Sequence, residues 1–138
     1  GKGAILSMKA ALKDAGMQPE EIDYVNVHGT STPLGDIAEL KAVAGVFGDH
    51  VYDLNISSTK SMTGHLLGAT GAIEALACIL ALTRGVVPPT INVEELDPEI
   101  DAKLNLTLGK AQHRDVKAAM SNTFGFGGHN STIIFRKF

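Results

Sequence analysis

The chain has 138 residues, a formal net charge of -3 and 44% hydrophobic residues, which is typical of one globular domain with a packed core. The lack of a basic surplus argues against sequence-independent binding of nucleic acid, which requires many lysine and arginine contacts to phosphate. We expect no membrane span, because no apolar run approaches the roughly 20 residues that cross a bilayer, and no secretory signal segment opens the chain. The single cysteine, Cys78, excludes an internal disulfide and is consistent with a reducing cytosol.

The first predicted elements are a helix and a short strand. The helix is expected to end at Gly16 and is predicted from apolar residues at helical spacing, namely Ile5, Met8, Leu12 and Ala15. The strand is predicted over residues 24–28, where side chains alternate, and it ends on His28. A domain of this class usually begins with a strand, so we expect a further segment before this helix.

A second helix is predicted after the strand. We expect Thr32 to cap it, Pro33 to occupy its first position, Asp36 to lie in its first turn and Gly48 to end it. Its inner face is expected to comprise Ile37, Leu40, Ala44 and Phe47.

The remaining elements complete an α/β pattern. We predict a strand over residues 51–56, a helix over 68–83, a weak strand over 104–108, and strands over 116–121 and 131–136 that form an antiparallel hairpin. The helix is apolar nearly all round, which predicts burial on several sides. The order of elements indicates a layered α/β domain with a mixed sheet.

Two polar segments follow the first two strands, at residues 25–36 and 58–71. They contain His28, Lys60 and His65. If the strands are parallel neighbours, these side chains meet at one edge of the sheet, as a site that stabilises a developing anion requires. The structural alternatives are that His28 is a capping or core histidine and that Lys60 forms an ion pair with Asp36 or Glu39.

Other chemistries have weaker signals. A zinc site is not favoured, because no compact histidine pair such as His-x-x-x-His is present. Cys78 lies mid-helix among apolar residues, which raises a thiol pKa, so we interpret it as a core residue. The glycine-rich loop at residues 124–128 is interpreted either as a source of oxyanion-binding amides or as a hairpin with two core phenylalanines.

Three ordered motifs carry a resemblance to a known family. They are Val-His-Gly-Thr-Ser-Thr-Pro at 27–33, Thr-Lys-Ser-Met-Thr-Gly-His at 59–65 and Asn-Thr-Phe-Gly-Phe-Gly-Gly at 122–128. Together they resemble the β-ketoacyl-acyl carrier protein synthases, and the second motif is most similar to the elongating type II enzymes. The resemblance covers residues 1–138 and only the C-terminal half of that family. It implies half of a thiolase-like α/β/α/β/α fold, with the nucleophilic cysteine on an absent N-terminal half.

The resemblance also implies roles for individual residues. His28 and His65 resemble the paired histidines that bind the malonyl thioester and stabilise its enolate as carbon dioxide leaves. Lys60 resembles a lysine that supports the site, paired with Glu39. The substrate-binding positions that it implies are Thr30 and Thr32 for the phosphopantetheine arm, and Phe124 and Gly125 near the acyl pocket. A structural monovalent cation is implied more weakly near Asn26, Glu74, Ser121 and Asn122.

The family resemblance implies decarboxylative Claisen condensation in fatty acid elongation, carried out in the cytoplasm without a cofactor. The substrates would be carried on acyl carrier protein, and the full enzyme would be a homodimer without nucleic-acid or membrane partners. A polyketide ketosynthase domain is a near alternative, although such domains tend to read Lys-Ser-Asn-Ile-Gly-His where this chain has Lys-Ser-Met-Thr-Gly-His at 60–65. A non-catalytic partner of the same fold, such as a chain-length factor, is the alternative from a different functional class.

Overall fold

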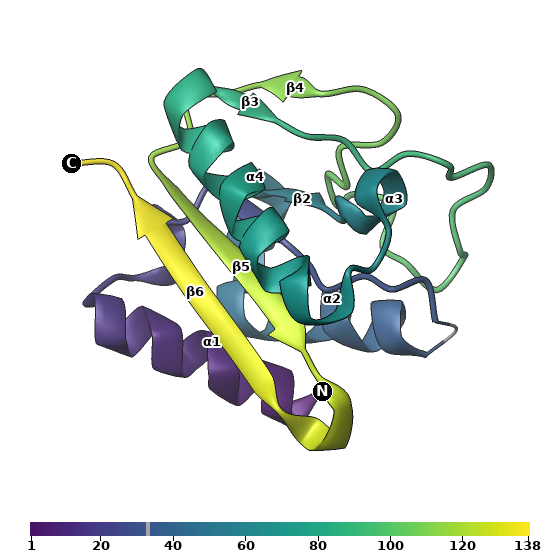
Figure 1. Ribbon diagram of the computed structural model, residues 1–138, viewed down its shortest axis with the longest axis horizontal. Helices are drawn as coiled ribbons and strands as arrows, with labels where there is room; N and C mark the ends of the chain where they lie inside the picture. Colours follow the sequence, from purple (N-terminus) through teal and green to yellow (C-terminus); the bar gives the residue numbers. More distant parts are fainter. Residues whose placement is uncertain (33) are drawn as a thin grey trace.

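The computed structural model describes residues 1–32 and 34–138 and is built on a mixed four-stranded sheet (Figure 1). Its strands are β1 (Tyr24–Asn26), β2 (Asn55–Ser57), β5 (Ala118–Phe124) and β6 (Asn130–Arg136). In the order β2-β1-β5-β6, β1 lies parallel to both of its neighbours, while β5 and β6 form an antiparallel hairpin. The mixed sheet and its C-terminal hairpin are therefore as the sequence predicts.

Three longer helices cover the two faces of the sheet. The first two, α1 (Lys2–Ala15) and α2 (Gly35–Phe47), pack on one face, and α4 (Thr70–Arg84) crosses the other (Figure 1). Gly16 ends α1 in the left-handed region at φ 63°, and its N–H donates to the carbonyl of Lys13 at 3.1 Å. Glycine takes this conformation without steric cost, so the predicted end of the first helix is confirmed.

Short elements connect this framework. They are the 3-10 turns η1 (Pro19–Glu21), η2 (Gly48–Asp53), η3 (Leu67–Ala69) and η4 (Phe126–Gly128), the single-turn helix α3 (Lys60–Thr63), and the antiparallel strands β3 (Val86–Val87) and β4 (Gln112–His113).

Several predicted boundaries differ from the structure. Helix α2 begins at Gly35 with Leu34 as its N-cap, so Thr32 does not cap it, and the expectation for Pro33 lies outside the described residues. Strand β2 begins at Asn55 because residues 48–53 form η2 instead. Residues 104–108 form only isolated bridges, from Asn105 to Asn55 and from Leu108 to Thr90.

The core divides into two clusters, one on each face of the sheet. Val25 and Val27 point into the cluster under α1 and α2, whereas Tyr24 points into the cluster under α4. On α2 the buried residues are Glu39, Ala42, Val43 and Phe47. The predicted inner face is therefore confirmed at Phe47, which is buried, and at Leu40 and Ala44, which are partly buried and pack against the same cluster, whereas Ile37 is only partly buried.

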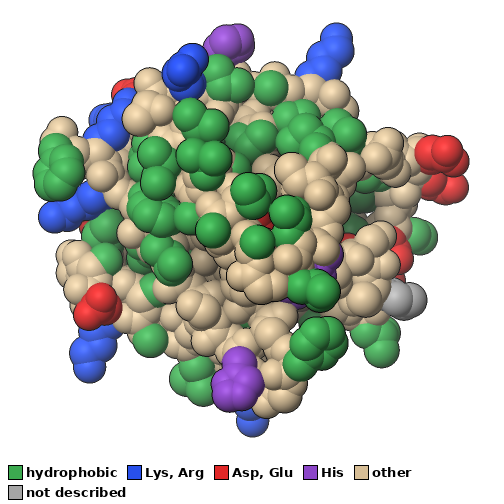
Figure 2. All heavy atoms as spheres, viewed as in Figure 1, with side chains coloured by type: hydrophobic (Ala, Val, Ile, Leu, Met, Phe, Trp, Pro, Cys, Tyr) green, Lys and Arg blue, Asp and Glu red, His purple; other side chains and the backbone are tan. Residues whose placement is uncertain are grey.

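Helix α4 buries one face only. Its inward residues include Glu74 and Cys78, while Leu76, Ile79 and Leu80 are between 41% and 51% exposed. The prediction of burial on several sides is thus wrong within this chain, and an apolar surface is visible where α4 faces the viewer (Figure 2). Residues Leu67–Arg84 are also long and apolar enough, by length and composition, to cross a membrane, which the sequence analysis did not recognise.

Candidate active site

The carboxyl ends of three neighbouring strands bring the predicted site residues together. His28 follows β1, Lys60 follows β2 and Phe124 ends β5. Because β1 lies parallel to β2 and to β5, these strands end on the same edge of the sheet. The rings of His28 and His65 lie perpendicular with centroids 5.5 Å apart, and the Phe124 ring lies 5.7 Å from His28. The predicted convergence at one sheet edge is therefore present in the structure.

The local backbone fixes the orientation of His65. This residue lies in the turn between α3 and η3, and its Nδ1 accepts a hydrogen bond from the N–H of Leu67 at 3.1 Å. Since Nδ1 accepts, the proton of the neutral ring is on Nε2, which becomes a donor. Leu67 has φ 52°, a strained conformation for leucine, and strain of this kind is often concentrated at functional sites.

A buried carboxylate holds the main chain at His28. The N–H groups of His28 and Gly29 donate to the two carboxylate oxygens of Glu39, at 2.8 and 2.9 Å. Gly29 has φ 37°, and a Cβ there would lie 2.7 Å from Cβ of Ser58. The turn after β1 therefore requires glycine. This turn fixes the position of the His28 main chain, from which the imidazole side chain extends.

Electrostatics keep the His28 ring neutral. Burial, followed by electrostatic contributions of Lys60 and then of the neighbouring His65, lowers the pKa of His28 from 6.5 to about 4. Burial raises the pKa of Glu39 to about 7, although the backbone donors of Gly29 and His28 oppose this shift. At neutral pH the imidazole of His28 is thus uncharged and can serve as a hydrogen-bonding group.

The lowered pKa of His28 predicts a stability change in acid. Between pH 6.5 and about 4 the unfolded chain binds a proton at His28 that the folded chain does not, so stability falls as pH falls through this window. We expect wild type to lose more free energy of unfolding than His28→Gln between about pH 7 and about pH 4.5, as measured by urea denaturation. Glu39 titrates in both proteins, so its contribution to the pH dependence cancels in the comparison. Equal losses of free energy of unfolding in wild type and His28→Gln would therefore contradict the prediction.

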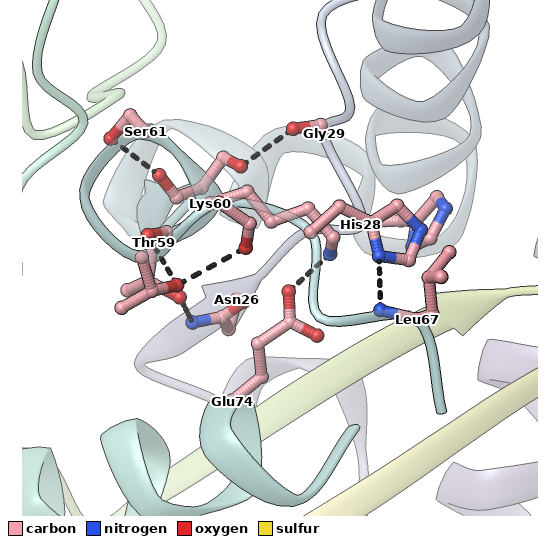
Figure 3. Close-up of polar contacts among 12 residues, drawn as sticks. Asn26, His28, Gly29, Thr59, Lys60, Ser61, Leu67 and Glu74 are labelled. Carbon is pink, nitrogen blue, oxygen red and sulfur yellow. Dashed lines mark hydrogen bonds and ion pairs between the residues drawn. The ribbon is translucent and has the colours of Figure 1, made fainter. Parts of the chain in front are cut away.

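Lys60 pairs with a different carboxylate from the one expected. Its Nζ contacts Oε1 of Glu74 in α4, and the two side chains are 5% and 1% exposed (Figure 3). The expected pairing of Lys60 with Glu39 is therefore wrong, because Glu39 lies on the opposite face of the sheet and binds backbone amides. Burial raises the pKa of Glu74, and the ammonium of Lys60 partly offsets that rise.

A buried polar network, which the sequence analysis missed, supports this edge of the sheet. The hydroxyls of Tyr24 and Ser57 are hydrogen-bonded at 2.7 Å. Asn26 Nδ2 donates to the hydroxyls of Tyr24 and Thr59, at 3.0 and 3.1 Å. Thr59 immediately precedes Lys60, so the network ties β1 to the start of α3. Asn26 and Tyr24 alternate with the apolar residues of β1, which is the signal that could have indicated an inward polar face.

Two oxygens near the Lys60–Glu74 pair fit the implied structural cation. Asn26 Oδ1 and Glu74 Oε2 are buried without a hydrogen-bond partner among the described residues. Carbonyl and carboxylate oxygens are the ligands that hard cations take, so both could contribute to such a site. The described residues contain no cluster of three or more histidine, cysteine, aspartate or glutamate side chains of the kind that binds transition metals.

The implied substrate-binding residues lie beside the histidines, in the loop after β1 and at the end of β5. Thr30 and Thr32 are in the loop between β1 and α2, where Thr32 is exposed. Phe124 faces His28, as described above. The N–H of Gly125 donates to the carbonyl of His129 at 2.6 Å, so within this chain it is used by the hairpin and is not free to bind an oxyanion.

Cys78 is not an activated thiol. It is fully buried on α4, and its Sγ approaches the carbonyl of Met120 at 3.9 Å. Burial raises the pKa of Cys78 to about 12, with Glu74 adding to the rise. A thiol with this pKa is protonated at neutral pH and is a poor nucleophile.

Comparison with known proteins agrees with this geometry. The family model described as "Beta-ketoacyl synthase, C-terminal domain" matches residues 1–94, which include both histidines, Lys60 and Glu74. The chain belongs to the beta-ketoacyl synthase family. It is 50% identical over all 138 residues to 3-oxoacyl-[acyl-carrier-protein] synthase 2 of Synechocystis sp. and to that of Staphylococcus aureus. The chain spans about a third (33%) of the length of these curated relatives.

Solved structures share the fold of this beta-ketoacyl synthase segment. A beta-ketoacyl synthase from Burkholderia phymatum superposes with a TM-score of 0.90 at 44% identity, over 98% of this chain and 32% of that one. A type II polyketide ketosynthase, solved with its acyl-carrier protein and a hexaketide, gives 0.92 at 36% identity, over 98% of this chain and 33% of that one. The expected thiolase-like class is confirmed, and the described part of the chain supplies one helix–sheet–helix unit of it.

Proposed function

We propose that this chain is the C-terminal part of an enzyme that condenses malonyl-acyl carrier protein with an enzyme-bound acyl thioester in fatty acid elongation. The observation that carries the proposal is the facing pair of imidazoles, His28 and His65, at the carboxyl edge of a parallel strand pair. Family membership and the relatives named 3-oxoacyl-[acyl-carrier-protein] synthase 2 support the same reaction.

In the proposed reaction the imidazoles bind the malonyl thioester oxygen. When the bond to the carboxylate breaks, carbon dioxide leaves and the electron pair becomes an enolate whose negative charge lies on that oxygen. The Nε2–H of His65, oriented through Nδ1 by Leu67, donates to this oxygen. The enolate carbon then attacks the acyl thioester, and the cysteine thiolate leaves. The donors are positioned before charge develops, so little reorganisation is needed.

The nucleophile of this reaction must come from outside residues 1–138. Cys78 is the only cysteine of the chain, and it is buried with a raised pKa. We therefore propose that residues 1–138 form one domain, completed by an N-terminal half that carries an activated thiol. The uncovered apolar residues Leu76, Ile79 and Leu80 of α4 are the surface on which such a half would pack.

The proposed partners follow from the proposed reaction. Acyl carrier protein would present both substrates on its phosphopantetheine arm, so no separate cofactor is required. A homodimeric enzyme in the cytoplasm is the setting that we propose. Among the solved relatives, one ketosynthase is described in complex with an acyl-carrier protein and another, from Xenorhabdus doucetiae, in complex with its chain length factor.

A polyketide ketosynthase is the second candidate function, because polyketide enzymes are among the structures that share this fold. A non-catalytic chain-length factor is less well supported, because it would not need His28 and His65 facing each other. Product length distinguishes the first two. Repeated condensation without reduction would indicate polyketide synthesis, whereas one condensation per cycle would indicate fatty acid elongation.

The proposal is tested with acyl- and malonyl-acyl carrier protein as substrates and mass spectrometry of the 3-oxoacyl product. The full-length protein should form product, and its Cys78→Ala variant should keep most of that activity. The 138-residue chain alone should form none. Product from the isolated chain, or loss of acyl-enzyme formation in a correctly folded Cys78→Ala protein, would overturn the assignment of the nucleophile to another segment.

A further inference from the structure

A cleft lies on the face of the sheet opposite the two imidazoles. It is bounded by α2 and by the irregular segment 90–108, and its volume is about 300 Å³. Its floor is formed by Val27, which directly follows β1, and by Ile56 of β2, and both point away from the side of the sheet that carries Tyr24 and α4. A volume of this size is at the lower end of the range of small-molecule sites.

A second hollow lies beside the first along α2. Its volume is about 210 Å³, and it shares the apolar lining residues Ile37, Leu40 and Ile100 with the first. All three shared side chains are partly buried. An apolar ligand would cover the exposed parts of these side chains and displace water from them. Burial of this apolar surface would contribute favourably to the free energy of binding.

The charges around the larger hollow are of one sign. Its charged lining residues are Asp36, Glu39, Glu95 and Asp97, and among the described residues no lysine or arginine lines it. Burial raises the pKa of both Asp36 and Glu39, because water does not fully solvate the two carboxylates there. A cation placed beside them would stabilise the ionised forms.

We propose that this cleft binds an organic ammonium ion, with its apolar body on Ile37, Leu40 and Ile100 and its charged group toward Asp36 and Glu95. Charge complementarity selects a cation over a neutral or anionic ligand of the same shape. The cleft is separate from the proposed catalytic pair, because the imidazole of His28 lies on the other side of the sheet, but Thr32, an implied phosphopantetheine-binding residue, also lines the cleft.

The cleft nevertheless shares a wall with the catalytic turn. Gly29 lines the cleft, and its N–H donates to Glu39. Asp36 accepts a hydrogen bond from the N–H of Ser31 at 3.1 Å. An ammonium ion near these carboxylates would compete for the same oxygens, so the amide of Gly29 should report occupancy.

The test compares three probes of one shape: benzylammonium, benzyl alcohol and benzoate. We expect benzylammonium to bind the 138-residue chain with a Kd on the order of 1 mM, measured by titration of the amide resonances. The alcohol should bind about fivefold more weakly and benzoate more weakly still. Chemical-shift changes should include Gly29 and the residues around Ile100. Equal affinity for the three probes, or changes confined to other surfaces, would overturn the proposal.

Neighbouring glutamates provide a matched control. Glu95 lines the cleft, whereas Glu94 does not, and both are exposed. Glu95→Gln should weaken benzylammonium binding about threefold, and Glu94→Gln should leave it nearly unchanged. Ile37→Trp should block the hollow and abolish binding. Equal effects of the two glutamine variants, or binding that survives Ile37→Trp in a folded chain, would show that the cleft is not the site.

Discussion

His65→Ala in the full-length protein is expected to slow malonyl decarboxylation by about 100- to 1,000-fold, the usual cost of losing an oxyanion donor. Acyl transfer to the nucleophilic cysteine should change little, because it depends on the thiolate and its own oxyanion site. The physical reason is that Nδ1 of His65 accepts from Leu67, which leaves Nε2–H as the donor to the enolate oxygen. Carbon dioxide release and acyl-enzyme mass measure the two half-reactions separately.

A conservative variant and a remote one complete this experiment. His65→Gln places an amide N–H close to the position of the histidine Nε2–H and should retain more decarboxylation than His65→Ala. His113, which is exposed in β4, is the matched control, and its alanine variant should behave as wild type. If both half-reactions fell equally in His65→Ala, the residue would be structural and not a donor to the enolate.

The site positions could be predicted from the sequence because they depend on topology. Parallel neighbouring strands end at one edge, so His28 and Lys60 had to lie close once the strands were recognised. The pairing of Lys60 with Glu74 required a further step. Glu74 is the only charged residue between Thr70 and Thr83, and a charge on the inward face of an apolar helix needs a buried partner.

Local boundaries were harder to predict because tertiary contacts decide them. Residues 51–53 are predicted as the start of a strand, yet they belong to η2, in which Nε2 of His50 donates to the carbonyl of Ile22 at 2.8 Å. His50 is partly buried as a result. The hairpin was easier to predict, because β-branched and aromatic residues are concentrated in β6, where Ile133, Ile134 and Phe135 lie opposite β5.

The periodicity of apolar residues in α4 could not show which part of the protein buries each side of this helix. Apolar residues all round a helix indicate contacts on several sides, but they do not show whether the same chain supplies them. Here the sheet covers Cys78 and Ala81, and Leu76 and Leu80 remain exposed. The amount of exposed apolar surface is a property of the assembled structure, which only the packing of α4 against β5 could show.

Lys60→Met is expected to destabilise the chain by about 3–5 kcal/mol, the cost of leaving one member of a buried ion pair unpaired. Methionine keeps the apolar stem, so the loss is mainly that of charge and hydrogen bonding. Glu74 would then remain 1% exposed without its cation, and its pKa, which burial already raises, should rise further. Urea denaturation at neutral pH measures the loss of stability.

The double variant Lys60→Met/Glu74→Gln separates the charge from the packing. Glutamine has nearly the shape of glutamate and carries no charge, so it removes the uncompensated carboxylate. The double variant should therefore recover more than half of the stability lost in Lys60→Met. Lys41→Met, at an exposed position on α2, is the matched control and should change stability by less than about 0.5 kcal/mol. If the double variant were as unstable as Lys60→Met, the loss would come from the packing of the lysine stem, and the Lys60–Glu74 pair would have no coupling energy of its own. If the stability of the double variant recovers, the result shows that Glu74 can be buried near the two imidazoles only when Lys60 compensates its charge.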